Sequence, residues 1–321
     1  MTLRAAIVLV FAICAGTAFV FPWLLRWGRP RSRAVWLLWA LDITLCEWIL
    51  YQQTDWTLAS VYLRYPPVLL AAYCMATSWP RAGAAPLPGH GAPRRSLPLQ
   101  IVRGLGLCFG AGALALLVTV LLELQQSDTL TAVALDWPLG PERGFVLQGG
   151  ASQLRNHHVP VQAQQRALDV VALGAAGKRM VGLFPAELSR YSVYGAQVHA
   201  PCTGEVTAVE NGCPDRQPLA DEQTAHLAGN FVALYCAKEN VTVVLAHLQR
   251  GVPVALGERL RSGQVLGRVG NSGSTTEPHL HIHAVRGRVS SEEELLGATA
   301  SGLAMSFHGQ RLARGDWFGS D

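Results

Sequence analysis

His279-Leu280-His281-Ile282-His283, near the C-terminal end of this 321-residue chain, repeats histidine at every second position. Side chains of an extended strand alternate between its two faces, so a strand here would place all three imidazoles on one face. Imidazole is a common zinc ligand at neutral pH and a common acid–base group in catalysis. The segment therefore predicts a metal site, either with two histidine ligands or with one ligand beside a catalytic histidine. The alternative is a surface strand that is rich in histidine.

The chain around this segment, from about residue 145 onward, has the pattern of a mainly β domain. Short runs rich in β-forming residues are broken by glycine, proline and asparagine. These runs are Arg166–Leu173, Val198–Ala200, Glu205–Glu210, Phe231–Cys236 and Val241–His247. Glu292–Leu296 is one short helical candidate. We therefore expect residues 145–321 to form a mainly β domain with the histidine-rich strand near its end.

The first 125 residues have a different composition. Half of all residues in the chain are apolar and only 15% are charged, and the apolar excess lies before about residue 125. An apolar run of about 20 residues is long enough to cross a bilayer as a helix. The candidate runs are Ala5–Leu25, Ala34–Tyr51, Leu58–Trp79 and Gly104–Leu122. We therefore expect residues 1–125 to form an α-helical membrane domain of about four transmembrane helices, followed by a linker at 126–144.

Arginines orient this helical domain. They gather in the loop after the first run and in the loop between the third and fourth runs. Arginine-rich loops stay in the cytoplasm, so four spans place the β domain on the periplasmic or extracellular side of the cytoplasmic (inner) membrane. The expected protein is multi-pass and contacts the lipid bilayer. The net charge is only +4 and the arginines lie between apolar runs, which argues against a nucleic-acid partner.

Three of the seven cysteines lie in the β domain, at positions 202, 213 and 236. An oxidising compartment outside the membrane would allow one disulfide among Cys202, Cys213 and Cys236. Three pairings are possible, and the sequence does not choose among them. The other four cysteines fall in the apolar runs, where they are expected to be inert packing residues.

Several motifs of the β domain together resemble the lysostaphin-like (LytM-type) zinc endopeptidases. They are Gly270–Gly273 with Pro278–His281, Val244–Leu248, Val198–Pro201 with Gly204–Val206, and the spacing of Gly257, Gly263, Gln264 and Gly267. They occur in the family's order, and the resemblance extends from about residue 145 to about 307. It implies a fold of antiparallel β-sheets and a zinc-dependent peptidase that cuts peptide bonds of peptidoglycan. The membrane half is not part of the resemblance.

The resemblance also implies roles for individual residues. By position in the motifs, His281 would be a zinc ligand and Asp169 the carboxylate ligand, while His247 and His279 would be the two catalytic histidines. The chain departs from the family pattern four residues before Asp169, where the family has a histidine and this sequence has Gln165. Glutamine is a poor zinc ligand, so a third ligand has to come from elsewhere if the site binds metal.

Two explanations of this departure remain. In the first, the loop Asn156-His157-His158 folds back over the metal and supplies the ligand, with His158 preferred over His157. Superfamily members that pair an Asn-x-His element with a Gln-Arg-x-Ala-x-Asp strand resemble this chain, in which Gln165-Arg166-Ala167-Leu168-Asp169 is similar to that strand but one residue shorter. In the second, the domain has lost zinc and binds the cell wall or activates another wall hydrolase.

The expected function is therefore that of a membrane-anchored zinc metalloendopeptidase. Its metal ligands would be His158, Asp169 and His281, its cofactor Zn²⁺ and its substrate the peptide part of peptidoglycan, with membrane or cell-wall proteins as further partners. A fold-level alternative is a biotinyl or lipoyl carrier or a sugar-phosphotransferase component. A carrier needs an exposed lysine in a cofactor-bearing turn, and neither Lys178 nor Lys238 stands in such a setting.

Overall fold

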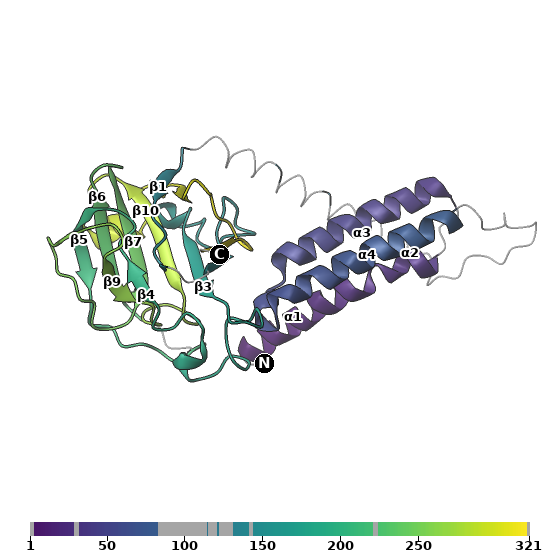
Figure 1. Ribbon diagram of the computed structural model, residues 1–321, viewed down its shortest axis with the longest axis horizontal. Coiled ribbons are helices and arrows are strands. Elements are labelled where there is room, and N and C mark those ends of the chain that lie inside the picture. The colour runs from purple at the N-terminus through teal and green to yellow at the C-terminus, as the bar shows by residue number, and fades with distance from the viewer. Residues whose placement is uncertain are drawn as a thin grey trace, which may run out of the picture. The chain divides into compact units, whose positions relative to one another are not determined.

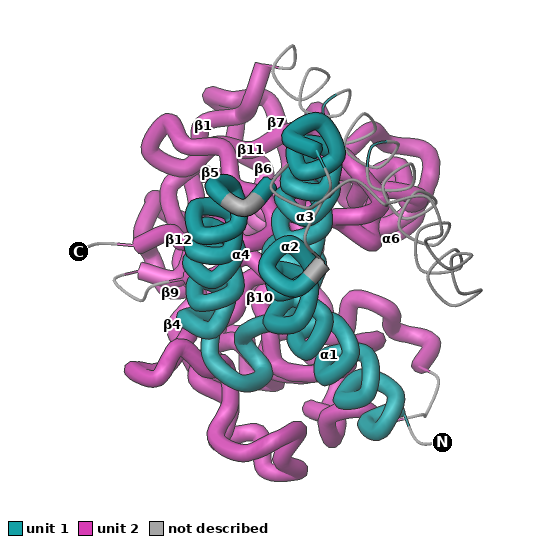
Figure 2. The backbone as a smooth tube through the Cα atoms, turned by 90° about the vertical axis from the view of Figure 1, so that its right-hand side faces the viewer, with its two compact units in different colours: residues 1–122 teal, residues 123–321 magenta. Residues whose placement is uncertain are grey.

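The computed structural model describes residues 3–28, 32–82, 131–140, 144–220 and 224–319, together with Leu114 and Leu121. The chain divides into two compact units, Met1–Leu122 and Glu123–Asp321 (Figure 2). The first unit is helical and the second is mainly β (Figure 1).

Long apolar helices make up the first unit. Its α-helices are α1 (Leu3–Val20), α2 (Trp23–Gly28), α3 (Arg33–Gln53) and α4 (Tyr65–Ser78). The segment Leu3–Trp27, which includes α1 and most of α2, has 25 residues, and Arg33–Gln53 has 21 residues. Both are long and apolar enough to cross a membrane by length and composition. The described residues thus contain two candidate spans rather than the four that we expected.

The third expected span, Leu58–Trp79, differs from a single membrane helix. Its first residues lie in two short 3₁₀ helices, Trp56–Leu58 and Val61–Arg64, and α4 that follows has only 14 residues. Prolines stand at the start of α4, where a missing backbone N–H costs nothing, so the α-helix begins there instead of continuing from upstream. The fourth expected span, Gly104–Leu122, lies outside the described residues apart from Leu114 and Leu121.

The second unit is built on one large sheet, as the sequence predicted for a mainly β domain. Within the described residues its strand order is β12-β2-β3-β10-β7-β6-β5-β8, and all neighbouring strands are antiparallel. These strands are β2 (Gly144–Gln148), β3 (Leu168–Ala172), β5 (Gly204–Glu210), β6 (Asn230–Cys236), β7 (Val241–Leu248), β8 (Arg259–Leu260), β10 (Leu280–Arg286) and β12 (Trp317–Phe318).

Two small sheets complete the unit. β1 (Val133–Leu135) runs parallel to β11 (Met305–Phe307), and β4 (Gln197–His199) pairs antiparallel with β9 (Val265–Arg268). β1 lies in the segment 126–144 that we expected to be a linker, and it pairs within the β unit. The helix α6 (Glu292–Leu296) coincides with the predicted short helix.

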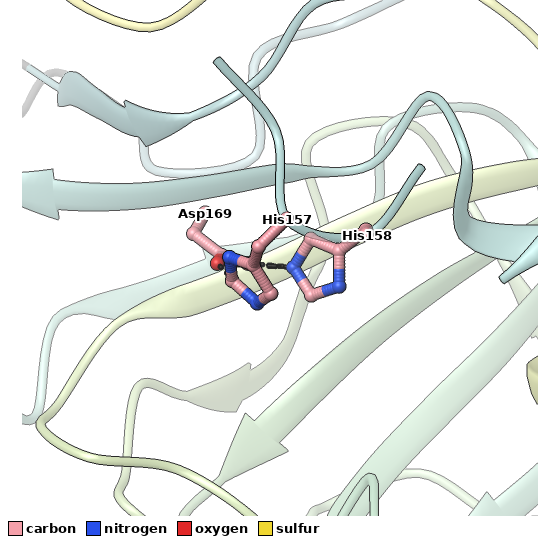
Figure 3. A group of neighbouring side chains, drawn as sticks. All are labelled: His157, His158 and Asp169. Atoms are coloured by element: carbon pink, nitrogen blue, oxygen red, sulfur yellow. Dashed lines mark hydrogen bonds and ion pairs between the residues drawn. The ribbon is translucent and has the colours of Figure 1, made fainter. Parts of the chain in front are cut away.

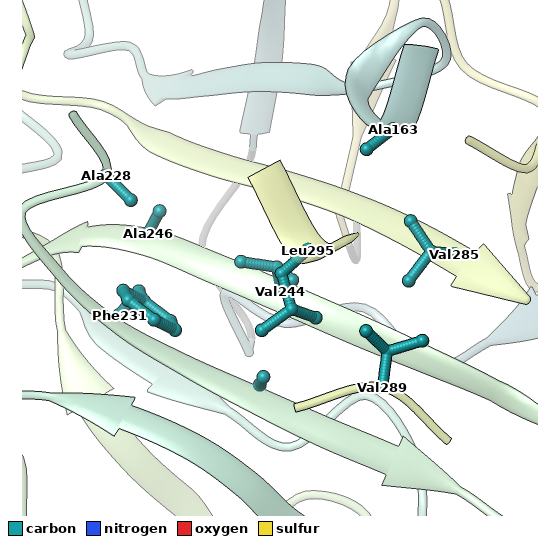
Figure 4. Packing of buried hydrophobic residues seen from close by; sticks show 9 residues of the cluster. Ala163, Ala228, Phe231, Val244, Ala246, Val285, Val289 and Leu295 are labelled. Carbon is teal, nitrogen blue, oxygen red and sulfur yellow. The ribbon is translucent and has the colours of Figure 1, made fainter. Parts of the chain in front are cut away.

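The central strands are buried on both faces. Every residue of β7 is buried, and so is every residue of β10 except Arg286. One face of β6, β7 and β10 packs against α6 and the 3₁₀ turn Gln162–Gln164, through Leu295 and Ala163 (Figure 4). Strands covered on both faces read as nearly continuous apolar runs, which is why β7 shows little alternation in the sequence. Buried polar residues in such strands need hydrogen-bond partners, and the buried histidines of β7 and β10 form part of the site described below.

A disulfide joins Cys202 to Cys236 at the end of β6, with a Cα–Cα separation of 5.9 Å. The sequence predicted one disulfide in this domain and left three pairings open. The structure selects one of them and leaves Cys213 as a buried free thiol.

Candidate metal and catalytic site

Strand register brings Asp169 and His281 together. β3 and β10 are antiparallel neighbours, and Asp169 lies directly opposite His281 in the ladder. Directly opposed residues project to the same face of the sheet. Asp169 Oδ1 therefore lies 3.0 Å from His281 Nδ1, with both side chains almost fully buried. On the other side of His281 the ladder partner is Ala246, whose small side chain leaves the imidazole room.

The loop before β3 adds a second histidine to this carboxylate. His158 Nε2 lies 3.0 Å from each of the two carboxylate oxygens of Asp169 (Figure 3). The His158 side chain is only 13% exposed. Three side chains from a loop and two strands thus converge at one point: His158, Asp169 and His281.

Asn156 holds this loop in place. It is fully buried, and its Nδ2 lies 3.1–3.3 Å from three backbone carbonyls that fix both ends of the loop, those of Gly150, Gln165 and Ala167. Its Oδ1 accepts a hydrogen bond from the backbone N–H of His158 at 3.0 Å. Buried amides satisfied on both ends fix a single local conformation. Asn156 therefore fixes the loop conformation that places His158 beside Asp169.

His157 and Gln165 lie differently. The His157 side chain is 62% exposed, packs at a tilt against His158 with ring centroids 3.9 Å apart, and has its Nε2 3.9 Å from Asp169 Oδ2. His157, His158 and Asp169 form a group of potential ligand atoms within 4.8 Å of one another. Gln165 turns away: its Nε2 donates to Ser301 Oγ at 3.1 Å and lies 3.4 Å from the Gly302 carbonyl. The side chain at the family's usual ligand position is thus bonded elsewhere.

A β-bulge aims His247 at the same site. The pairing of β6 with β7 jumps from Val232–Leu245 to Asn230–Leu248, so β7 contains one extra residue there. His247 has a left-handed backbone conformation, with φ of 61°. Bulges re-aim side chains next to active sites, and a non-glycine residue at positive φ is uncommon without such a constraint. The ring of His247 consequently lies 4.8 Å from that of His279 and 5.9 Å from that of His281, between centroids.

The loop that contains Ser272 fixes the orientation of His247. His247 Nδ1 lies 2.8 Å from the Ser272 carbonyl oxygen, which can only accept, so Nδ1 carries the proton. The Ser272 hydroxyl in turn bonds the Leu248 carbonyl at 2.7 Å and the Asn230 N–H at 2.9 Å. Gly229 allows this close approach, because a Cβ there would lie 2.3 Å from the Ser272 carbonyl carbon. The Nε2 of His247 is therefore the ring nitrogen with a free lone pair.

His279 precedes β10 and is oriented in the same way. Its Nδ1 lies 2.8 Å from the Glu277 carbonyl oxygen, and its Nε2 lies 3.5 Å from Asp169 Oδ1. The Glu277 carboxylate forms a two-point ion pair with Arg179, with N–O distances of 2.9 and 2.8 Å. Arg179 is 3% exposed and Glu277 8%. This buried pair anchors the segment that positions the His279 ring.

Burial governs the electrostatics of the site. Burial alone would raise the pKa of Asp169, but the electrostatic influence of His279 and His158 and the side-chain contacts with His158 and His281 hold that pKa well below its ordinary value. Burial lowers the pKa of His247 to about 3 and keeps the pKa of His281 well below its ordinary value. Near neutral pH the centre therefore combines an ionised Asp169 with neutral His247 and His281, and a carboxylate and a neutral imidazole are the forms that bind a metal ion.

The three converging side chains fit zinc. Bonds of 2.0–2.1 Å at tetrahedral angles place neighbouring ligand atoms roughly 3.3 Å apart. The nitrogens of His158 and His281 both lie 3.0 Å from oxygens of Asp169, close to that spacing. Two imidazoles and one carboxylate are also a usual donor set of catalytic zinc sites, which keep a fourth position for water or substrate.

Other histidines have different positions. His283, on the same face of β10 as His281, is fully buried and contacts His281, a role that the sequence did not assign although its period-two spacing placed it there. His226 and His308 are exposed, and His199 is half-buried beside the Pro138 carbonyl, so these three stay outside the site as expected. His90 lies outside the described residues.

Comparison with known proteins identifies the domain. Residues 190–292 match the model of peptidase family M23, and the chain thus contains an M23 peptidase domain. This confirms the predicted resemblance to lysostaphin-like peptidases over that range. The match includes His247, His279 and His281, whereas His158 and Asp169 lie before it. Among curated protein sequences, none matches this chain.

Several solved structures are similar to the chain. The catalytic domain of the antimicrobial peptidase lysostaphin from Staphylococcus simulans is 22% identical, with 40% of this chain and 78% of that chain covered and a TM-score of 0.25. A zinc-containing peptidase from Vibrio cholerae is 18% identical, with 37% and 46% covered and a TM-score of 0.23. Csd3 from Helicobacter pylori is 18% identical, with 54% and 37% covered and a TM-score of 0.25. The chain thus spans less than half the length of the latter two proteins.

Proposed function

We propose that this protein is a membrane-anchored, zinc-dependent endopeptidase that hydrolyses peptide bonds of peptidoglycan. One observation carries the proposal: a histidine–aspartate–histidine cluster of His158, Asp169 and His281 lies beside a second pair of histidines, His247 and His279. The cluster has the spacing of a zinc ligand set, with Asp169 3.0 Å from both imidazoles. In His247 and His279 the Nδ1 atom is bonded to a backbone carbonyl oxygen, so the lone pair of each neutral ring is on Nε2.

In the proposed chemistry the first group binds the metal ion and the second group transfers protons. A zinc ion bound by His158, Asp169 and His281 would polarise the scissile carbonyl and lower the pKa of the attacking water. The Nε2 atoms of His247 and His279 are suited to accept the proton of that water and to return it to the leaving amine. A protonated Nε2 would also stabilise negative charge as it develops on the carbonyl oxygen. The backbone bonds to both Nδ1 atoms keep the rings in the required tautomer throughout.

The substrate and the location form the second part of the proposal. The M23 match favours a peptidase, and similarity to lysostaphin, an antimicrobial peptidase, favours the cell wall as its target. Two candidate spans and one disulfide in the β unit favour a membrane anchor with the peptidase outside the cytoplasm. A reporter fused to the C-terminus tests this topology: activity of an extracytoplasmic reporter is expected, and a cytoplasmic reporter signal would eliminate peptidoglycan as substrate.

Metal content tests the metal site. We expect about one zinc per full-length chain purified in detergent, retained in His157→Ala and lost in His158→Ala and Asp169→Asn. His157→Ala is the matched control, since it removes the neighbouring imidazole that keeps 3.9 Å from the carboxylate. Absence of zinc from the wild type even after loading would favour the other reading of Gln165, a degenerate domain that binds the wall or activates another hydrolase.

The catalytic roles need a second test. His247→Ala and His279→Ala should retain zinc but release soluble peptides from purified peptidoglycan roughly 10²–10⁴ times more slowly, the usual contribution of a general acid–base group. Full activity of the His279→Ala chain would refute the assigned roles. Loss of zinc from either variant would instead make that histidine a ligand.

A further inference from the structure

The third histidine of the β10 motif, His283, has a position that packing alone does not explain. It is fully buried, on the same face of β10 as His281. Both of its ring nitrogens have partners. Its Nδ1 lies 2.8 Å from His281 Nε2, and its Nε2 lies 2.7 Å from the Leu295 carbonyl oxygen in α6. A backbone carbonyl, a buried histidine and a candidate zinc ligand thus form one continuous chain.

The chemistry of these partners determines which ring nitrogens of His283 and His281 carry a proton. The Leu295 carbonyl can only accept, so His283 Nε2 must carry a hydrogen and donate it. A neutral imidazole has one donor and one acceptor nitrogen, so with Nε2 donating to Leu295 the Nδ1 of neutral His283 is the acceptor. His281 Nε2 must therefore be an N–H that donates to His283. This holds for either protonation state of His281 Nδ1, because only His283 has to be neutral.

The result is a defined tautomer of His281. With its proton on Nε2, the ring directs the Nδ1 lone pair toward Asp169, whose Oδ1 lies 3.0 Å away. Two acceptors facing each other at that distance repel, and a proton or a cation bound beside them removes the repulsion. The alternative tautomer would turn an N–H toward the carboxylate and take away the ligand atom. The position of the proton on His281 thus decides whether the ring can bind a metal.

We infer that His283 is a positioning residue, which fixes the ring orientation and the Nε2–H tautomer of His281 so that Nδ1 is available to a divalent metal ion. The inference rests on the proposed metal site and goes beyond it, since it assigns a role to a residue outside the ligand set. Groups that hold the second nitrogen of a ligand histidine contribute about 10- to 100-fold to metal affinity. The neighbouring Val285, two residues along the same face, has no polar atom and serves as a packing control.

Two variants separate hydrogen bonding from packing. His283→Phe fills the same space but leaves His281 Nε2 and the Leu295 carbonyl without a partner. His283→Gln retains an acceptor and a donor in one side chain. The dissociation constant for Zn²⁺, measured on the full-length chain by competition with a chelator, should rise about 10- to 100-fold in His283→Phe. It should stay within about threefold of the wild type in His283→Gln and in the control Val285→Ala, a range too small to reflect loss of such a partner.

A second readout does not depend on metal. In the metal-free chain labelled with ¹⁵N-histidine, long-range ¹H–¹⁵N correlation spectra distinguish the two imidazole tautomers. We expect the Nε2–H form of His281 in the wild type and in His283→Gln. A wild-type His281 in the Nδ1–H form would overturn the inference, even if His283→Phe fails to fold. Equal zinc affinity of His283→Phe and wild type would also overturn it.

The two readouts also distinguish this inference from the proposed function. A wild-type chain that binds no zinc would refute the zinc peptidase, while the tautomer of His281 in the metal-free chain would still decide the role of His283. A chain that binds zinc with His281 in the Nδ1–H form would leave the peptidase intact and refute the inference alone.

Discussion

Arg179→Met should destabilise the β unit and slow catalysis without releasing metal. The variant removes one partner of the buried ion pair with Glu277, in which Arg179 is 3% and Glu277 8% exposed. Removal of one member of such a pair leaves an uncompensated buried charge, at a cost of about 3–5 kcal/mol. Solvent screening is negligible at this burial, so the full cost is expected. The double variant Arg179→Met/Glu277→Leu removes both charges and should be close to wild type in stability.

Alkylation of Cys213 measures this effect in the full-length chain. Cys213 is a buried free thiol of the β unit, and peptide mass spectrometry separates it from the cysteines of the helical unit. If a reagent reacts only when the unit unfolds, its rate follows the unfolding equilibrium. A loss of 3–5 kcal/mol then raises the rate by about two to four powers of ten. An unchanged rate in Arg179→Met would refute the stabilising role of the pair.

The same variant tests the link to His279. The Glu277 carbonyl accepts from His279 Nδ1 at 2.8 Å, so movement of this segment displaces the ring of His279, the proposed catalytic residue. A displacement of about 1 Å costs on the order of 100-fold in turnover, while the zinc ligands lie elsewhere and retain the metal. Peptidoglycan hydrolysis at wild-type rate by a destabilised Arg179→Met chain would show that the pair supports the fold but does not position His279.

Three further outcomes follow from the contacts described above. Asn156→Ala leaves buried carbonyls without donors, so it should cost about 1–3 kcal/mol and weaken zinc binding through His158, measured by chelator competition; unchanged affinity would contradict the positioning role. Replacing both Cys202 and Cys236 by alanine opens a loop with a separation of 34 residues and should cost about 4 kcal/mol in the alkylation assay. Burial lowers the pKa of His283 from 6.5 to about 4, so the unfolded chain takes up the proton first as the pH falls. The neutral form of His283 therefore contributes about 3 kcal/mol to the free energy of unfolding above pH 6.5, and this contribution is lost as the pH falls toward 4. His283→Gln should remove that part of the pH dependence of stability in chelator-treated protein.

The fold of the β unit could be predicted further than that of the helical unit. The strands β5, β6 and β7 lie within one residue of the predicted runs, because β-branched and apolar residues bounded by turn residues define them. The predicted run Leu58–Trp79 failed as a single helix because hydropathy does not register where proline starts a helix. Strand order was beyond the reach of the sequence as well, since pairing depends on contacts between distant segments.

Within the site, the parts on strands were easier to predict than the parts in loops. The period of two placed His281 and His283 on one face, but not the register that sets Asp169 opposite His281. His247 was found through its motif, whereas its bulge is a property of the pairing between β6 and β7. The ion pair of Arg179 and Glu277 joins residues 98 positions apart, and no local pattern marks it.

In the proposed metal site His158 takes the place of a ligand at position 165, and the spacing of ligands along the chain is then a weaker constraint than their position in space. A metal ion requires donor atoms at bonding distance and sets no condition on the number of residues between them. Here the side chain at 165 lies before β3 and bonds Ser301, while the loop at 156–158 returns to the same carboxylate. The residue that makes this possible is Asn156, whose buried amide bonds the backbone at both ends of the loop and the N–H of His158. A missing histidine in a motif therefore indicates a lost site only when no neighbouring loop can deliver a donor to the same point. In this chain the proposed delivery of His158 depends on Asn156 as well as on the histidine itself.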